Sequence, residues 1–530
     1  MNQSETSSVP IAQAAQLAPQ SFAFVDLAAL VAASALQRPA STAVVDGERR
    51  IDYAAFNTLT DRVAAALQQA GLIAGQIIAI CAASSIEYLA VFLGALRAGV
   101  AVAPLAPSST PQQIRDMVLD SQARLLFVDG PVAQALNAAL PALPNQPAQI
   151  RLDVAQGDAA LGSWLQLAPA QPAPVAIEPA WAFNIIYSSG TTGTPKGIVQ
   201  SHAMRWLQVQ YAPVFGFGTN TKTLVATPLY SNTTMTTLLP TLAFGGCLVL
   251  LAKFDAGAYL KLAQTERATH TMLVPVQYQR LLAWQDFGQF DLTSFHAKFC
   301  TSAPLSASLK ADIVARWPGA MIEFYGMTEG GGSCMLIANE HPDKLHTVGQ
   351  PIEGHDIRLI DEEGRELVRG QIGEVVGRSA TMMSGYHRQP DKTSTAQWTD
   401  GDGNVYIRTG DVGRFDEDGF LILLDRRKDM IISGGFNIYP SDLEAVLRLH
   451  PAVADVAVVG VPSALWGETP VAFVVRRADQ QAGADGILEW SNRQLGKTQR
   501  LGGLRFVAEL PRSAIGKVLK RELRDAWNAS

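Results

Sequence analysis

Helical stretches and short apolar runs alternate along the first half of the chain. Residues 55–71 carry apolar side chains at helical spacing and stop at Gly71, and residues 85–98 repeat this pattern before Gly99. Short strand-like apolar runs separate such stretches, at residues 77–81, 100–104 and 124–128. This alternation predicts a parallel sheet covered by helices on both faces.

The sequence between residues 130 and 180 is rich in Ala, Gln and Pro, and predicts a surface connection rather than core. It ends before a short predicted strand, residues 183–187. Further alternation of strand and helix follows from about 223 to 325.

After residue 350 the pattern changes to short strands separated by turn sequences, which indicates a small β lobe. Beyond residue 428 it becomes mixed, with predicted helices at 441–449, 485–498 and 516–527 and strands at 454–460 and 470–476.

The length of 530 residues exceeds the ~250–300 residues that one hydrophobic core usually serves. We therefore expect a large α/β N-terminal domain over residues 1–427, made of two α/β subdomains plus the β lobe. A smaller α+β C-terminal domain is expected over residues 428–530.

Composition narrows the function classes. Lys and Arg number 42 and Asp and Glu 48, so the net charge of 42 − 48 = −6 gives no basic field for nucleic acid. The four cysteines are widely spaced, which argues against a zinc site or a disulfide framework. No signal peptide or membrane span is predicted, since the longest apolar stretch, 238–252, is interrupted by glycines and shorter than ~20 residues. A cytoplasmic protein is expected.

The most distinctive motif is the decapeptide SSGTTGTPKG at residues 188–197. Its glycines allow a ligand to approach the backbone closely, successive N–H groups can form an anion-binding nest, and Lys196 supplies positive charge. A polyphosphate is the natural ligand, and a Gly/Ser/Thr-rich surface loop is the alternative. An ordinary P-loop is disfavoured, because Lys196 follows Pro195 instead of glycine.

With the preceding tyrosine, the string YSSGTTGTPKG resembles the phosphate-loop signature of the adenylate-forming superfamily, which includes acyl- and aryl-CoA synthetases, peptide-synthetase adenylation domains and beetle luciferases. Four further motifs follow in the family's order, so the resemblance spans residues 25–525. It implies ATP, Mg²⁺ and coenzyme A as cofactors and substrates. Lys196 would be catalytic, and the nucleotide would be bound by Ser188, Ser189, Gly190, Thr191, Thr192, Gly193 and Thr194.

The second motif is YGMTE, residues 325–329. The resemblance implies that Tyr325 stacks on adenine beside Gly326, that Thr328 contacts the α-phosphate as a catalytic residue, and that Glu329 holds Mg²⁺. A carboxylate beside a polyphosphate is repulsive unless a hard cation bridges them. Taken alone, the pentapeptide would be a loop with a surface glutamate. The resemblance also places Ser302, Ala303 and Pro304 in the adenine pocket.

The third and fourth motifs imply a ribose site and a hinge. By resemblance, Asp411 and Arg426 contact the ribose hydroxyls, and the terminal domain rotates about Lys428. The segment with Gly434, Gly435 and Phe436 resembles the lining of a pantetheine tunnel. In isolation, these motifs would be a turn and a charged linker.

In the fifth motif, PRSAIGKV, the resemblance implies that Lys517 bridges the substrate carboxylate and the α-phosphate. The acyl pocket is expected at His202, Tyr230, Ser231, Gln277 and Met327. Two further features of the sequence bear on this pocket. His202 is equally well explained as a capping residue, and the polar pair Ser231 and Asn232 replaces the aromatic or histidine residue of many relatives.

The sequence therefore predicts an ATP-dependent acid–thiol ligase, which forms an acyl-AMP and then an acyl-CoA from an aryl or medium-chain monocarboxylic acid. Two alternatives remain: a ligase that loads the phosphopantetheine of a carrier protein, and a nucleotide-binding sensor without catalysis. Homodimers are common in the family that this chain resembles, so the resemblance allows for a homodimer.

Overall fold

The computed structural model describes residues 23–139, 147–154, 156–157, 159–188, 196–426, 428–433, 436–477, 480–496, 499–513 and 516–528. The chain forms two compact units. The first comprises residues up to 356 together with 377–407, and the second comprises residues 357–376 and 408–530. The boundary predicted between residues 427 and 428 is that of a domain that rotates as a whole. The two compact units do not test such a rotation, so this boundary stays a prediction.

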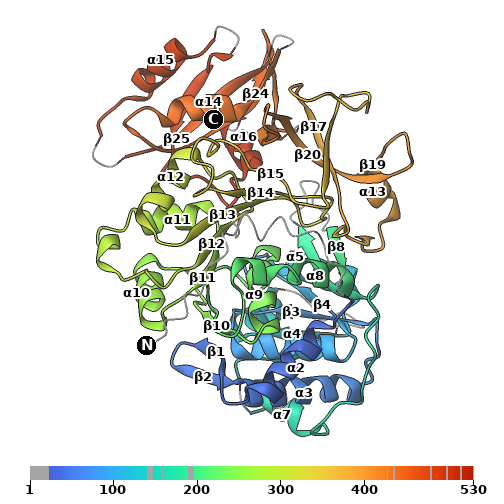
Figure 1. Cartoon of the computed structure of the whole chain (residues 1–530). Helices are drawn as coiled ribbons and strands as arrows, with labels where there is room; N and C mark the ends of the chain where they lie inside the picture. Colours follow the sequence, from blue (N-terminus) through green and yellow to red (C-terminus); the bar gives the residue numbers. More distant parts are fainter. Residues whose placement is uncertain are drawn as a thin grey trace, which may run out of the picture. The chain divides into compact units, whose positions relative to one another are not determined.

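Two large sheets build the first unit (Figure 1). The nine-stranded sheet has the order β15 (Gln350–Pro351), β14 (Cys334–Ile337), β13 (Ala320–Tyr325), β12 (Ala297–Cys300), β11 (His270–Leu273), β9 (Lys222–Val225), β10 (Cys247–Leu250), β1 (Thr42–Asp46) and β2 (Arg49–Asp52). The seven-stranded sheet has the order β18 (Gly385–Tyr386), β8 (Lys196–Ser201), β7 (Ala182–Ser188), β4 (Ala101–Pro104), β3 (Ile77–Cys81), β5 (Leu125–Val128) and β6 (Ala148–Arg151).

A single apolar core joins these sheets. It contains Val44 and Leu248 from the nine-stranded sheet and Ile78 and Val102 from the seven-stranded sheet. Four helices that pack together fill the space between, which Figure 1 shows in blue and green: α2 (Leu27–Gln37), α3 (Tyr53–Gln69), α4 (Ile86–Arg97) and α9 (Asn232–Ala243).

Other helices cover the outer faces, as expected for strands that are apolar on both sides. Over the nine-stranded sheet lie α10 (Ala256–Glu266), α11 (Pro275–Leu282) and α12 (Ala307–Arg316). Over the seven-stranded sheet lie α5 (Pro111–Ser121) and α6 (Gly130–Ala139). The predicted α/β class is confirmed.

The remaining elements of this unit are α7 (Leu161–Gln166), α8 (His202–Val209), η1 (Ala212–Phe215), η2 (Phe287–Gln289), α13 (Pro390–Thr395) and β19 (Gln397–Thr399).

The expectation of a mere surface connection over residues 130–180 was wrong. Helix α6 buries Val132 and Leu136, β6 pairs with β5 and buries Ile150, and α7 buries Leu161. The Ala- and Pro-rich composition concealed an apolar helical face, and β6 is stabilised by backbone pairing with a neighbour distant in sequence.

The second unit begins with the β lobe, where β16 (Asp356–Ile360) adjoins β17 (Gly373–Arg378). Strand β20 (Val405–Phe415) enters this unit after residue 407 and pairs there with β21 (Leu421–Arg426). The C-terminal sheet has the order β23 (Phe436–Ile438), β22 (Ile431–Ser433), β25 (Gly467–Arg476) and β24 (Val453–Ser463), with β26 (Gly503–Phe506) beside β25.

Three helices pack on this sheet: α14 (Pro440–Arg448), α15 (Ala484–Gln494) and α16 (Lys520–Asn528). The last starts at Lys520, four residues later than the predicted 516, because Val518 forms a β-bridge with Arg512 instead of a helical turn. Among the described residues, no helix combines the length and apolar character that a membrane crossing requires.

Candidate active site

Strands β7 and β8 hold the ends of the predicted phosphate loop together. They form an antiparallel pair in which Ser188 lies opposite Lys196 and Tyr187 opposite Gly197. The loop thus leaves and re-enters the sheet at neighbouring positions, as expected for a ligand-binding turn on a rigid scaffold. Its other predicted residues lie outside the described part of the chain: Ser189, Gly190, Thr191, Thr192, Gly193 and Thr194.

Lys196 and Glu329, from different motifs, both contact one tyrosine, Tyr386. The Tyr386 hydroxyl donates to Glu329 Oε1 at 2.9 Å, and Lys196 Nζ lies 5.2 Å from the centre of the Tyr386 ring. Burial and the neighbouring carboxylate raise the pKa of Tyr386, so the phenol stays neutral and remains a donor. Tyr386 is missing from the residues predicted from the sequence. It follows Gly385, whose φ of 142° favours glycine, but only the structure shows that angle.

The YGMTE segment leaves the end of β13 and is fixed by bonds to its backbone. Met383 N donates to the Glu329 carbonyl at 2.8 Å, and Gln200 Nε2 donates to the Thr328 carbonyl at 2.8 Å. At Gly330 (φ 77°), a Cβ atom would lie 2.0 Å from the Thr381 carbonyl oxygen, so only glycine fits. The loop is therefore rigidly supported, with the Met327 side chain against Tyr386 and its apolar neighbours.

The predicted adenine-pocket residues follow the neighbouring strand. Strands β12 and β13 are parallel and paired, so Ser302 and Tyr325 come from the same edge of the sheet. Ligands of α/β sheets bind at such carboxyl ends. Ser302 has φ 81°, unusual for a residue with a side chain, and its hydroxyl bonds to that of Thr233 on α9. Strained backbone of this kind concentrates at functional sites. Ala303, Pro304 and Gly326 lie in the adjoining loops.

In the second unit, the predicted ribose-binding pair lies together. Asp411 and Arg426 are opposite each other in the register of β20 and β21, and Arg426 Nε lies 3.1 Å from Asp411 Oδ1. Both side chains are partly exposed, so the pair can also reach a ligand.

The remaining C-terminal predictions fall on turns and on a β-hairpin. Lys517 is exposed on a tight turn in which its backbone N–H bonds to Ser513 Oγ. Burial of Lys428 lowers its pKa. Phe436 is 58 % exposed at the start of β23, and Gly434 and Gly435 lie outside the described residues.

The five residues predicted for the acyl pocket are not equivalent. His202 is buried against Phe183 with ring centres 5.1 Å apart, and burial lowers its pKa to about 4, so it is neutral at pH 7. Ser231 caps α9 by accepting from Thr233 N. Gln277 bonds the backbone through both ends of its amide, at Val274 N and the Ala226 carbonyl.

Tyr230 is half-buried, and burial raises its pKa. Gln277 and Ser231 thus have structural bonds that account for their polar atoms. Whether any of the five touches substrate stays a prediction.

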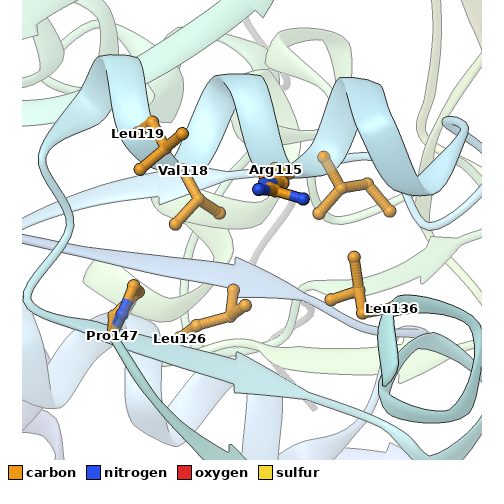
Figure 2. A pocket seen from close by; sticks show the side chains of 7 residues that line it. Arg115, Val118, Leu119, Leu126, Leu136 and Pro147 are labelled. Carbon is orange, nitrogen blue, oxygen red and sulfur yellow. The ribbon is translucent and has the colours of Figure 1, made fainter. Parts of the chain in front are cut away.

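Figure 2 shows a pocket away from these residues, between α5, α6 and β5. Its volume of about 10 Å³ holds one water molecule at most, so it is no site for a carboxylic acid.

Magnesium would have one clear protein ligand here. Among the described residues there is no group of three or more His, Cys, Asp or Glu side chains suited to a metal. Glu329 offers the carboxylate oxygen that Tyr386 does not engage, and Mg²⁺ commonly takes one or two carboxylates plus substrate phosphates. The residues present therefore fit an ion delivered with a nucleotide.

Comparison with known proteins agrees with this arrangement. The AMP-binding enzyme family matches residues 31–387, and the C-terminal domain of AMP-binding enzymes matches residues 442–517. The chain belongs to the AMP-binding enzyme family, and the resemblance to adenylate-forming enzymes is confirmed.

Curated relatives cover nearly the whole chain. A feruloyl-CoA synthase from Amycolatopsis sp is 32 % identical over 489 residues, which covers 92 % of this chain and 96 % of the relative. The fatty acid–acyl-carrier-protein ligase ScoC of Streptomyces coeruleorubidus is 30 % identical over 513 residues, covering 93 % and 95 %. The crystal structure of ATP-bound MatB from Rhodopseudomonas palustris superimposes with a TM-score of 0.83 at 29 % identity, covering 95 % and 99 %.

Proposed function

We propose that this protein is an ATP-dependent acid–thiol ligase that makes an acyl-CoA from an aryl or medium-chain monocarboxylic acid. The observation that carries the proposal is the meeting of Lys196 and Glu329 at Tyr386, at the end of the predicted phosphate loop. A cation and a potential magnesium ligand that contact the same tyrosine suit a triphosphate. The similarity to a feruloyl-CoA synthase supports the acid–CoA reaction.

In the first step, a substrate carboxylate oxygen attacks the α-phosphorus of ATP, the bond to the β-phosphate breaks, and pyrophosphate leaves. Lys196, the Thr328 region and Lys517 neutralise charge on the phosphoryl oxygens. Glu329 would hold Mg²⁺, which would supply further positive charge at these oxygens.

In the second step, the thiolate of coenzyme A attacks the acyl carbon, and the bond to AMP breaks. The terminal domain rotates about Lys428, removes Lys517 and brings Gly434, Gly435 and Phe436 beside the thiol. Asp411 and Arg426 hold the ribose in both steps.

A carrier-protein thiol is the second candidate acceptor, favoured by the 30 % identity to ScoC. Incubation with ATP and a panel of aryl, cinnamyl and fatty acids, followed by pyrophosphate release, tests the first step. Coenzyme A and a phosphopantetheinylated carrier protein, added separately, then distinguish the acceptors. If no acid gives pyrophosphate, the sensor alternative replaces this proposal.

A further inference from the structure

Arg205 of α8 is a fully buried arginine that joins four elements of the first unit. Its guanidinium donates to Asn184 Oδ1 on β7 at 3.3 Å, to Gln208 Oε1 on α8 at 2.9 Å, to Asn232 Oδ1 on α9 at 2.8 Å, and to Gln200 Oε1 on β8. Each of these acceptors is the oxygen of a neutral amide.

The charge of Arg205 has no counter-charge among the described residues. Burial lowers the pKa of its guanidinium to about 9, so the group is still protonated at neutral pH. Arg97, which is also mostly buried, instead pairs with the carboxylate of Asp61 at 2.5 Å. Burying a cation without a carboxylate partner costs free energy, and an apolar side chain in its place often stabilises a core equally well. Stability alone therefore does not explain why an arginine lies at this position.

Gln200 connects Arg205 to Thr328 in the proposed site. Because Arg205 binds the amide oxygen of Gln200, the amide nitrogen of Gln200 must point the other way. There it donates to the Thr328 carbonyl at 2.8 Å and to Asn232 Oδ1 at 3.3 Å. Many relatives have an aromatic residue or histidine in the segment where this chain has the polar residue Asn232. Its hydrogen bond with Arg205 explains that difference.

We propose that Arg205 is a positioning residue for acyl-AMP formation. By orienting Gln200 it fixes the Thr328 carbonyl, and with it the segment that presents Thr328 and Glu329 to the nucleotide. This inference rests on the proposed function, and it goes beyond that function by assigning the reaction a residue that touches neither substrate.

The first test is single-turnover formation of acyl-AMP by Arg205→Met, which nearly preserves volume but removes the donors. The rate constant should fall about 10²-fold, the effect of a displacement near 1 Å, while the amplitude per folded molecule stays unchanged. A purely structural role would lower the folded fraction and leave the rate constant of the folded molecules unchanged. Arg205→Lys keeps the charge without the fork of donors, and its rate constant should fall about 10-fold.

A second variant keeps the test decisive if Arg205→Met does not fold. Gln200→Glu places a carboxylate against the guanidinium and removes the donor to the Thr328 carbonyl. Its thermal stability should equal or exceed that of the wild type, yet its rate constant for acyl-AMP formation should fall at least 10-fold. A rate constant equal to that of the wild type would overturn the inference.

Arg97→Met is the matched control, because it removes a buried arginine outside the site. It should lower stability without changing the rate constant per folded molecule. Wild-type protein that releases no pyrophosphate with any acid overturns the proposed function and this inference with it. Active wild type with fully active Arg205 and Gln200 variants overturns the inference alone.

Discussion

Two buried cations, Arg205 in the first unit and Lys520 in the second, have partners of opposite kinds. The partners of Arg205 are neutral amides, and burial lowers its pKa. Lys520 is less completely buried, with 18 % of its side chain exposed, and Glu444 lies at 3.1 Å and Asp425 at 4.0 Å; these carboxylates outweigh burial and raise its pKa. The first cation has only neutral hydrogen-bond partners, whereas the second is neutralised locally.

The difference indicates different tasks. The cluster around Lys520 ties α16 to α14 and to the end of β21, and Arg524 adds a bond to Asp429 at 2.7 Å. These bonds stabilise the turn region that carries Lys517 relative to the residues around the proposed hinge. The network around Arg205 stabilises the loop that contains Thr328.

The largest expected effect comes from removing each cation in turn. Lys520→Met removes the cation that lies between the carboxylates of Asp425 and Glu444 and should lower the free energy of unfolding by about 3–5 kcal/mol. Arg205→Met leaves only neutral amides unsatisfied and should lower it by about 1–3 kcal/mol. Urea denaturation at pH 7 measures both values. Equal losses would remove the basis of the comparison.

Lys517→Ala separates the two half-reactions in the second unit. The rate of acyl-AMP formation should fall about 10²–10³-fold, because the variant loses a donor to the reacting phosphoryl group. Thioester formation from supplied acyl-AMP should stay near the wild-type rate. An equal loss in both half-reactions, in a folded protein, contradicts the two-conformation mechanism.

Acidification should affect the first unit before the second. Burial lowers the pKa of His202 and of His270 to about 4, below the unfolded value of 6.5. The unfolded chain therefore binds more protons below pH 6.5, and stability falls as pH decreases towards 4. At pH 5.5 the loss should be about 1 kcal/mol per histidine. Hydrogen exchange at pH 7 and 5.5 locates the loss of stability. The His202→Gln variant should lose about 1 kcal/mol less than the wild type between these two pH values.

Tyr386→Phe should have the smallest effect. It removes the hydrogen bond to Glu329 but keeps the ring beneath Lys196. Losing one such bond, about 1 kcal/mol, should weaken apparent Mg²⁺ affinity about 5-fold while the affinity for the acid stays constant. Magnesium titration of pyrophosphate release measures the change. An unaltered magnesium dependence would separate Glu329 from metal binding.

The sequence alone determined the type of many secondary-structure elements, through periodicity, and the class of the protein, through its motifs. The alternating strands and helices of the first half have the predicted type, since strands buried on both faces and amphipathic helices have distinct local patterns. The phosphate-loop motif was recognisable because glycines, hydroxyls and a lysine must lie within a few residues to surround phosphate. Composition misled between residues 130 and 180, where pairing with β5 decides that β6 is a strand.

Only the tertiary structure decided which distant polar groups meet. Tyr386 lies 57 positions from Glu329, and Gln200 lies 128 positions from Thr328, so no local pattern links either pair. Arg205 has the sequence context of any helical arginine. Its isolation from carboxylates arises because β7, β8 and α9 enclose it with amides, and the burial that results makes each of those bonds matter.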